Sequence, residues 1–173
     1  VTREADVVRA FEATVAEYGR IDVLVNNAGV TTHRPIGEMD LDYWNHAIAV
    51  NLTSAFIASR EAVKRMRAQS PQGGRIINMG SVSQKTPRPD SLAYTVAKHG
   101  LQGLTAQLTM DGRAYGVVAS IVHPGSTYTG FNNQGRSGPG PGATPDAYVM
   151  DAAEVARVVV LMATLPPEVN LYE

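Results

Sequence analysis

A tyrosine and a lysine stand four residues apart in the stretch SVSQKTPRPDSLAYTVAKHG, which covers residues 81 to 100. On a helix, Tyr94 and Lys98 share one face, with their side chains one turn apart. A nearby ammonium favours the phenolate, so we expect the pKa of Tyr94 to fall from about 10 toward the operating pH. A tyrosine tuned in this way can give a proton to a carbonyl oxygen or take one from an alcohol.

Ser81 begins the same stretch, thirteen residues before Tyr94 and directly after a segment typical of a buried strand. Its hydroxyl is able to hydrogen-bond the same substrate oxygen. The Tyr-Lys spacing alone is weak evidence, because a chain with seven tyrosines and three lysines produces such a pair by chance. The interpretation therefore depends on the elements that position these three residues.

Helical and strand patterns alternate along the chain. Apolar residues at three- and four-residue spacing predict a first helix, with Thr2 as its cap and Gly19 as its end. An apolar run from Ile21 to Val25 predicts a strand covered on both faces. Further helices are expected at 40–69 and 92–112, and further strands at 74–80 and 116–124. The length of the stretch 40–69 indicates two segments or a bend.

The end of the chain differs in character. Residues 125–150 are rich in glycine and proline and show no period, so we expect a long loop that acts as a lid over the substrate. Asp151 and Glu154 then predict a capping box for a last helix.

The order of these elements predicts the fold class. Helices and strands that alternate in this way form right-handed βαβ units around a parallel sheet. We therefore expect an α/β fold, a Rossmann-like doubly wound parallel sheet in three α/β/α layers, with about three parallel strands and flanking helices. The length of 173 residues fits one domain, 1–173.

Small and hydrogen-bonding residues follow each expected strand. Open parallel sheets bind ligands beyond the carboxyl ends of their strands. Any one of these segments has an ordinary explanation as a turn or a helix cap, but their common placement favours a binding site. The segments are residues 26–29, 78–81 and 123–125.

Composition argues against several other classes of function. The 15 basic and 16 acidic side chains give a net charge of -1, so no nucleic acid or anionic membrane partner is expected. No apolar run is long enough for a membrane span. The chain has no cysteine and its four histidines lack metal-ligand spacing, so we expect no metal site. A cytoplasmic protein that acts on a small molecule fits these properties best.

The motifs together, in their order and spacing, resemble the short-chain dehydrogenase/reductase family over nearly the whole chain. They are Asn26-Asn27-Ala28-Gly29, Asn51-Leu-Thr-Ser, Ser81, Tyr94-x-x-x-Lys98, and Pro124-Gly125 ahead of Thr129. The resemblance implies a sheet that binds NAD or NADP. It also implies an oxidoreductase that transfers hydride between the nicotinamide and the carbon of a ketone or secondary alcohol. Neither the substrate nor the preferred dinucleotide can be predicted from the sequence.

The resemblance further implies roles for single residues. Tyr94 would be the general acid and base, Lys98 would lower its pKa and hold the nicotinamide ribose, and Ser81 would orient the substrate oxygen. Asn51, at the bend of the long helix, would anchor a water that links Lys98 to solvent. The implied cofactor contacts are Asn26, Ala28, Gly29, Tyr94, Lys98, Pro124, Gly125, Thr127 and Thr129, although the family usually has Val or Ile at the position of Thr127.

The glycine-rich turn with which the family begins is not found in these residues. Residue 1 corresponds to a position just after the third strand of the family, and residue 173 lies short of its last strand. We therefore expect a partial Rossmann-type domain, about the C-terminal two-thirds of the family. The missing turn carries the backbone amides that bind the pyrophosphate, so the 173 residues alone are expected to bind NAD(P) weakly or not at all.

Two other interpretations remain open. A non-catalytic or truncated chain would keep the fold only for association, because the family forms dimers and tetramers through the helices expected at 40–69 and 92–112. The complete set of Asn51, Ser81, Tyr94 and Lys98 favours an enzyme instead. The sugar-nucleotide epimerase and dehydratase branch shares the Tyr-Lys pair, but Asn-Asn-Ala-Gly and the short C-terminal region argue against it.

Overall fold

The computed structural model describes residues 1–129 and 149–173, and it confirms the predicted α/β class. Three strands form a parallel sheet in the order β1-β2-β3. The helices and strands of this fold are α1 (Glu4–Tyr18), β1 (Val23–Asn26), α2 (Leu41–Ile48), α3 (Ser54–Ala68), β2 (Gly74–Met79), α4 (Leu92–Gly112), β3 (Val117–Val122) and α5 (Ala152–Thr164).

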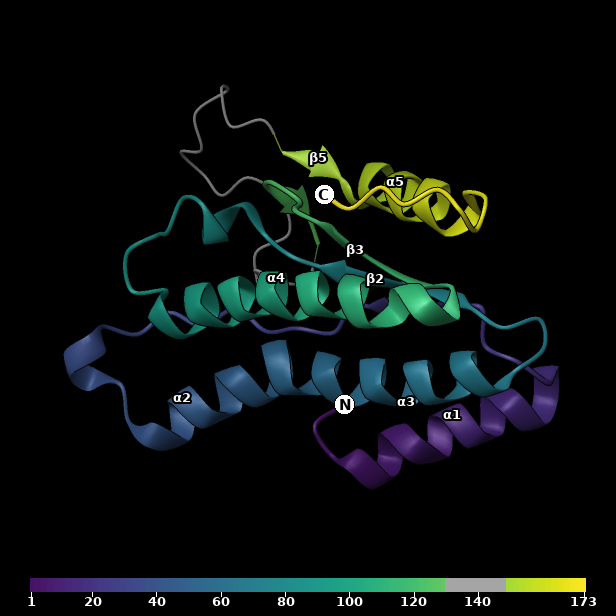
Figure 1. Ribbon diagram of the computed structural model, residues 1–173. Helices are drawn as coiled ribbons and strands as arrows, with labels where there is room; N and C mark the ends of the chain where they lie inside the picture. Colours follow the sequence, from purple (N-terminus) through teal and green to yellow (C-terminus); the bar gives the residue numbers. More distant parts are fainter. Residues whose placement is uncertain (130–148) are drawn as a thin grey trace.

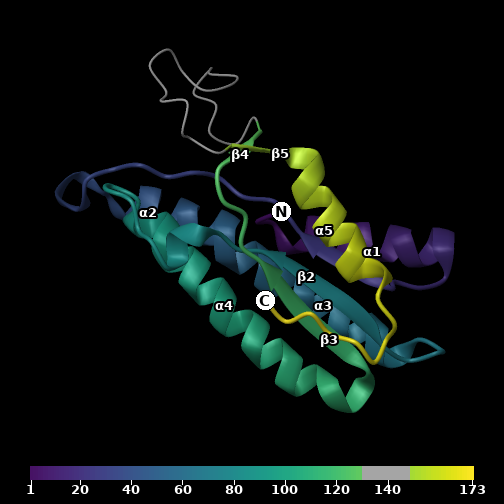
Figure 2. The ribbon, with the colours of Figure 1, turned by 90° about the horizontal axis from the view of Figure 1, so that it is seen from above.

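Helices lie on both faces of this sheet, as a doubly wound fold requires (Figures 1 and 2). On one face α3 packs against β1 and β2, and α4 packs along β3. α1 packs against α3 and forms the outside of this layer. α5 crosses the opposite face over β2. The three-layer α/β/α arrangement is therefore confirmed.

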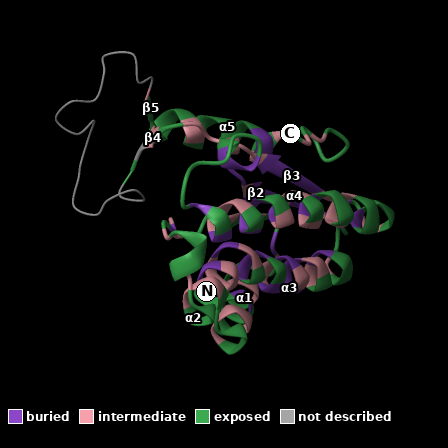
Figure 3. Cartoon of the chain, turned by 90° about the vertical axis from the view of Figure 1, so that its left-hand side faces the viewer, coloured by how far each residue is buried: buried purple, intermediate pink, exposed green. Residues whose placement is uncertain are grey.

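The core is centred on β2 and β3. Ile76, Ile77, Val117 and Ala119 are each fully buried, and Figure 3 shows the buried residues gathered in these strands and on the sheet-facing sides of α3 and α4. β1 differs, because Val23 and Val25 are 38% and 40% exposed. The prediction that this strand is covered on both faces is wrong, since α3 covers it from one side while α5 lies over β2.

The long helical stretch is divided, as its length predicted. α2 is followed by one π-helical turn, Ala49–Thr53, and then by α3. A π turn adds one residue to the helical repeat and is often found at functional sites. Here it contains the candidate residue Asn51.

The helix ends agree only in part with the sequence signals. Gly19 ends α1 in the left-handed conformation, as predicted. Thr2 does not cap that helix, because Arg3 occupies the N-cap position and makes no side-chain capping bond. Asp151 caps α5, because its carboxylate accepts the N–H of Ala153. Glu154 forms an ion pair with Arg157 instead of the reciprocal bond that a capping box requires.

The segment expected as a loop at 125–150 has structure at both ends. β4 (Thr127–Tyr128) and β5 (Met150–Asp151) pair in parallel, so the prediction of an unstructured loop is wrong there. Such a pairing joins residues more than twenty positions apart, and no local period signals it. Residues 130–148, which contain most of the expected lid, lie outside the described residues.

Close packing between α4 and β3 gives a first testable prediction. A Cβ at Gly112 would stand 2.3 Å from the carbonyl oxygen of Val117, in the buried first residue of β3. We expect Gly112→Ala to lower the free energy of unfolding by about 1–3 kcal/mol, measured by urea denaturation. Gly103 is the matched control, because a Cβ there meets nothing within 4 Å.

Gly103→Ala should raise the stability by about 0.5–1 kcal/mol through helix propensity alone. If both variants raised the urea midpoint equally, the close approach of α4 to β3 would be contradicted.

Candidate active site

A pocket of about 810 Å³ lies beyond the carboxyl ends of the three strands, where the sequence predicted a site. Its lining comes from the residues that follow β1, β2 and β3, from the first turns of α4, and from α5 on the other side. The described residues contributing to it include Asn27–Gly29, Met79–Ser83, Tyr94, Lys98, Pro124–Thr127, Thr129, Ala152 and Val155.

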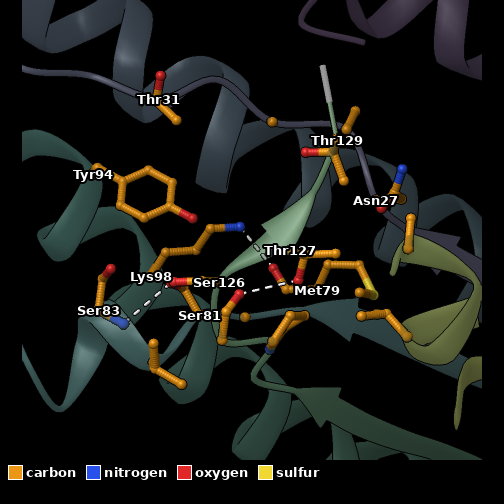
Figure 4. A pocket seen from close by; sticks show the side chains of 18 of the residues that line it. Asn27, Thr31, Met79, Ser81, Ser83, Tyr94, Lys98, Ser126, Thr127 and Thr129 are labelled. Carbon is orange, nitrogen blue, oxygen red and sulfur yellow. Dashed lines mark hydrogen bonds between the residues drawn. The ribbon is translucent and has the colours of Figure 1, made fainter. Parts of the chain in front are cut away.

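Tyr94, Lys98 and Ser81 meet in this pocket (Figure 4). The first two project from neighbouring turns of α4, and Ser81 follows the end of β2. The Nζ atom of Lys98 lies 5.5 Å from the centre of the Tyr94 ring. Ser81 is near enough to the Tyr94 hydroxyl to favour its phenolate and so to lower its pKa. Spacing on the helix and placement at the strand end therefore bring these three side chains together.

The orientation of Ser81 is fixed by its local backbone. Ser81 has an extended conformation and caps the short 3-10 turn Val82–Gln84. Its Oγ accepts the backbone N–H of Ser83 at 3.1 Å. A hydroxyl used as an acceptor in this way keeps its own proton for donation. Ser81 is thus able to donate toward the tyrosine or toward a substrate oxygen.

Burial raises the pKa of Tyr94 above its ordinary value of 10.0, against the expectation of a lowered pKa. The phenolate loses the stabilisation of water in the pocket, and this effect is larger than that of the favourable partners. A hydrogen bond from Ser81 and the positive charge of Arg88 act in the opposite direction. Tyr94 is therefore protonated at neutral pH.

Lys98 is a buried cation, with only 5% of its surface exposed. Its Nζ donates to the backbone oxygen of Met79 at 2.6 Å. Burial lowers the pKa of Lys98 from 10.5 to about 8. Among the described residues that line the pocket there is no aspartate or glutamate, so the ammonium faces a site suited to neutral or anionic oxygen ligands.

Asn51 supports the site without lining it. The residue is 98% buried and does not belong to the described lining of the pocket. Its Oδ1 accepts the Val30 N–H at 3.0 Å, and its Nδ2 donates to the Val30 oxygen at 3.1 Å. Nδ2 also donates to the oxygen of Ala47 at 3.0 Å. The π turn therefore holds the loop that follows β1, and the water expected at Asn51 stays a prediction.

The structure places Asn26 differently from the expected cofactor contact. Its Nδ2 donates to Asn78 at 2.8 Å and to Ser59 at 3.1 Å, joining β1 to β2 and α3. Its side chain does not belong to the described lining of the pocket, whereas that of the next residue, Asn27, does (Figure 4). Successive side chains near a strand end point to opposite faces, and the sequence does not say which face is which.

The other expected cofactor positions do line the pocket. They are Ala28, Gly29, Pro124, Gly125, Thr127 and Thr129. Thr127 donates through its hydroxyl to the oxygen of Gly125 at 3.1 Å, which leaves a compact turn after β3. Small residues therefore line two sides of the pocket.

Three residues of the site were given no individual role in the sequence, although His123 belongs to one of the expected binding segments, 123–125. Ser83 orients Ser81, Arg88 lines the pocket, and His123 contacts the backbone of Ser81. Only His123 carried a local signal, since it stands at the predicted strand end directly before Pro-Gly. The contacts of Ser83 and Arg88 depend on how the segment between β2 and α4 folds over the pocket, which the sequence does not indicate.

Two searches of the described residues bear on other functions. Within 1–129 and 149–173, no group of three or more His, Cys, Asp or Glu side chains is arranged to hold a metal ion. In that same part of the chain, no helix has the length and apolar character needed to cross a membrane.

Comparison with known proteins points to one family. The family model described as short chain dehydrogenase matches residues 1–139. The oxidoreductase YohF of Escherichia coli, whose function is uncharacterised, is 42% identical over 158 residues, which are 90% of this chain and 62% of YohF. Trans-4-hydroxycyclohexanecarboxylate dehydrogenase of Sinomonas cyclohexanicum is 34% identical, over 90% of this chain and 58% of that enzyme. The chain thus spans about three-fifths of the length of these relatives.

A solved structure agrees with this match. A metagenomic short-chain oxidoreductase in complex with NADP superposes with a TM-score of 0.79 and 29% sequence identity. The superposition covers 99% of this chain and 68% of that structure.

Proposed function

Since the chain belongs to the short-chain dehydrogenase family, we propose that it forms part of an NAD- or NADP-dependent oxidoreductase that interconverts a secondary alcohol and a ketone. The convergence of Ser81, Tyr94 and Lys98 beyond the ends of the strands carries this proposal. The dehydrogenase among the relatives and the NADP complex among the solved structures support it.

The residues present fit the nicotinamide half of such a cofactor. Pro124 and Gly125 bring the backbone after β3 to the lining and leave room for a flat ring, whereas Ala28 and Gly29 would lie toward the adenosine. The Lys98 ammonium has three protons, one of which goes to Met79, so it is suited to hold the hydroxyl groups of the ribose. Asn27 and Thr129 add polar groups to the same lining. When bound, the nicotinamide ring supplies or takes up the hydride.

Tyr94 supplies the proton in the direction of carbonyl reduction. Its raised pKa keeps the hydroxyl protonated at neutral pH, which is the form that a general acid needs. Ser81 donates to the carbonyl oxygen and so directs it toward Tyr94. As the proton leaves Tyr94, the Lys98 ammonium stabilises the phenolate that forms. In alcohol oxidation the same residues work in reverse, and the phenolate must be present at the start.

Association through two helices is a separate part of the proposal. Several apolar side chains on α2, α3 and α4 are exposed in the single chain, and such a surface is typical of a subunit interface. We expect a homodimer or homotetramer through residues 40–69 and 92–112. Association alone would not require a buried lysine beside a serine and a tyrosine, so a purely structural function is not favoured. The exposed side chains are Leu41, Phe56, Leu92, Val96 and Met110.

The activity itself is tested with a longer form of the protein. The 173 residues are joined at residue 1 to the glycine-rich nucleotide-binding segment that the family carries in front of this region. We expect this form to reduce ketones with NADH or NADPH, followed by the loss of cofactor absorbance, and the 173 residues alone to bind either cofactor weakly. A folded joined form that binds cofactor but reduces no ketone from a broad panel would contradict the proposal.

A further inference from the structure

We propose that His123 is a positioning residue for Ser81. Its neutral imidazole accepts the backbone N–H of Ser81 and holds that residue in place, and protonation of the ring at low pH releases it. The inference rests on the proposed role of Ser81 at the substrate oxygen. The observation that carries it is the hydrogen bond of 3.2 Å from Ser81 N to His123 Nδ1.

The hydrogen bonds fix the tautomer of the ring. A backbone N–H only donates, so Nδ1 must accept and carries no proton. The ring proton is therefore on Nε2, which donates to Oε1 of Gln102 at 3.0 Å. The amide nitrogen of Gln84, 3.1 Å from Nε2, is itself a donor and does not accept this proton; it donates to Gln102 instead. Both ring nitrogens are used in the neutral form. In the protonated ring, an N–H at Nδ1 would face the N–H of Ser81.

The packing around the ring shows that the contact is built into the fold. Only 13% of the His123 side chain is exposed. The ring lies against Gly80, where a Cβ would come within 2.4 Å of Nδ1. Because a larger residue at position 80 would displace the imidazole, the glycine before Ser81 allows it to reach the Ser81 N–H.

Ser81 is held through its N–H, its Oγ and its carbonyl oxygen, which accepts the N–H of Gln84 at 3.2 Å, and His123 provides the first of these contacts. The backbone N–H is bound by the imidazole, and the Oγ is bound by the N–H of Ser83. Without the bond to His123, the N–H of Ser81 loses its acceptor, and the position of residue 81 is less constrained. The hydroxyl then loses its fixed direction toward Tyr94.

Charged groups on three elements face the ring. The carboxylate of Glu173 lies 3.6 Å from Nε2 and favours protonation, but it is also paired with Lys85 at 2.7 Å. Burial of the ring opposes protonation, as do the charges of Lys85 and Lys98. The balance places the pKa of His123 below its ordinary value of 6.5. The ring is therefore neutral at physiological pH and changes state on the acidic side.

The contact is tested by NMR on the 173-residue chain, which requires no turnover. In the wild type, we expect the Ser81 amide resonance and the His123 ring nitrogens to shift together, with one midpoint below 6.5 and with Nδ1 unprotonated above it. His123→Asn keeps an acceptor oxygen near the position of Nδ1 but does not titrate, so the Ser81 amide should become independent of pH. His99, which is exposed on α4, is the control site: His99→Asn should leave the Ser81 titration unchanged.

His123→Phe completes the series, because it keeps a ring but removes the acceptor. Its Ser81 amide should exchange with solvent faster than in the wild type. A wild-type Ser81 amide that does not follow the ring titration, or a neutral ring with its proton on Nδ1, would overturn the proposal.

A second measurement follows catalysis in the joined form. We expect His123→Phe to lower kcat by about 10- to 100-fold, as a misplaced catalytic group does, with little change in the KM for the cofactor. His123→Asn should keep most of the activity and lose the acidic decline of the wild-type pH profile. If the wild type, His123→Phe and His123→Asn had equal kcat values and the same decline of activity at acidic pH, the positioning role of His123 would be overturned. Failure of the joined wild-type form to reduce any ketone would instead count against the oxidoreductase proposal, and the NMR result would stand apart from it.

Discussion

Replacing Tyr94 with phenylalanine lowers carbonyl reduction by about 10²- to 10⁴-fold in the joined form, the range that a general acid contributes. The substitution removes one hydroxyl and keeps the ring beside Lys98, so the fold and the affinity for the cofactor should change little. Steady-state kinetics gives kcat, and fluorescence titration with NADH or NADPH gives the affinity.

Tyr115→Phe is the matched control for this substitution. Tyr115 lies just before β3, at the other end of the sheet, where its ring stacks with Arg67. Loss of its hydroxyl should leave kcat unchanged. If the Tyr94 variant retained more than about a tenth of the wild-type kcat, Tyr94 would not be the general acid.

Replacing Lys98 with methionine should lower activity by about 100-fold while the chain stays as stable as the wild type or becomes more stable by about 1 kcal/mol. Activity falls because the ammonium that stabilises the phenolate is gone. Stability does not fall, because a buried cation held by one carbonyl oxygen is replaced by an apolar side chain of similar length. Measurement of kcat checks the expected loss of activity, and urea denaturation at neutral pH checks the expected stability.

The pH dependence of stability gives a sharper test of the same residue. The pKa of Lys98 is about 8 in the folded chain and 10.5 as its ordinary value, so the unfolded state binds more protons between these limits. The Lys98 contribution to stability therefore improves as pH rises from about 8 to 10.5, and Lys98→Met should lack this improvement. Lys85→Met removes an exposed lysine and should keep it. Identical slopes for the wild type and Lys98→Met would contradict the burial of a charged amine.

The parts of the site that the sequence predicted depend on local geometry. Tyr94 and Lys98 share a helix face because they are four residues apart, and this follows from the helical repeat alone. Ser81 and the segment around Gly125 stand at strand ends, which parallel pairing brings to one edge of the sheet. The strands were identifiable because each contains adjacent apolar residues, Ile76-Ile77 in β2 and Val117 to Val122, interrupted only by Ser120, in β3.

The parts that were missed depend on packing between distant segments. The pKa of Tyr94 is higher than expected because the side chain is buried in the pocket. The spacing of residues along a helix does not indicate how deeply they are buried. The side chain of Asn26 turned toward α3 rather than toward the pocket, since strand alternation leaves the choice of face open. His123 reached the backbone of Ser81 because Gly80 leaves room for its ring, a contact between residues 42 positions apart.

The error about the acidity of Tyr94 has its cause in burial. Proximity of Lys98 to Tyr94 was expected to make the phenol more acidic, but both groups are buried in the same place. Burial disfavours the charged form of each, so it raises the pKa of the tyrosine and lowers that of the lysine. The site therefore holds a neutral phenol suited to donate a proton.

The acidity of residue 94 is the quantity on which the proposed mechanism depends. Fluorinated tyrosine at position 94 keeps the hydroxyl and makes it more acidic, so it changes this quantity with little change in shape. The most direct measurement is the pH profile of alcohol oxidation in the joined form with tyrosine or fluorotyrosine at this position. We predict that the midpoint of the rise in kcat/KM with pH moves to lower pH with the fluorinated residue. A midpoint that stays in place would show that residue 94 does not take the proton.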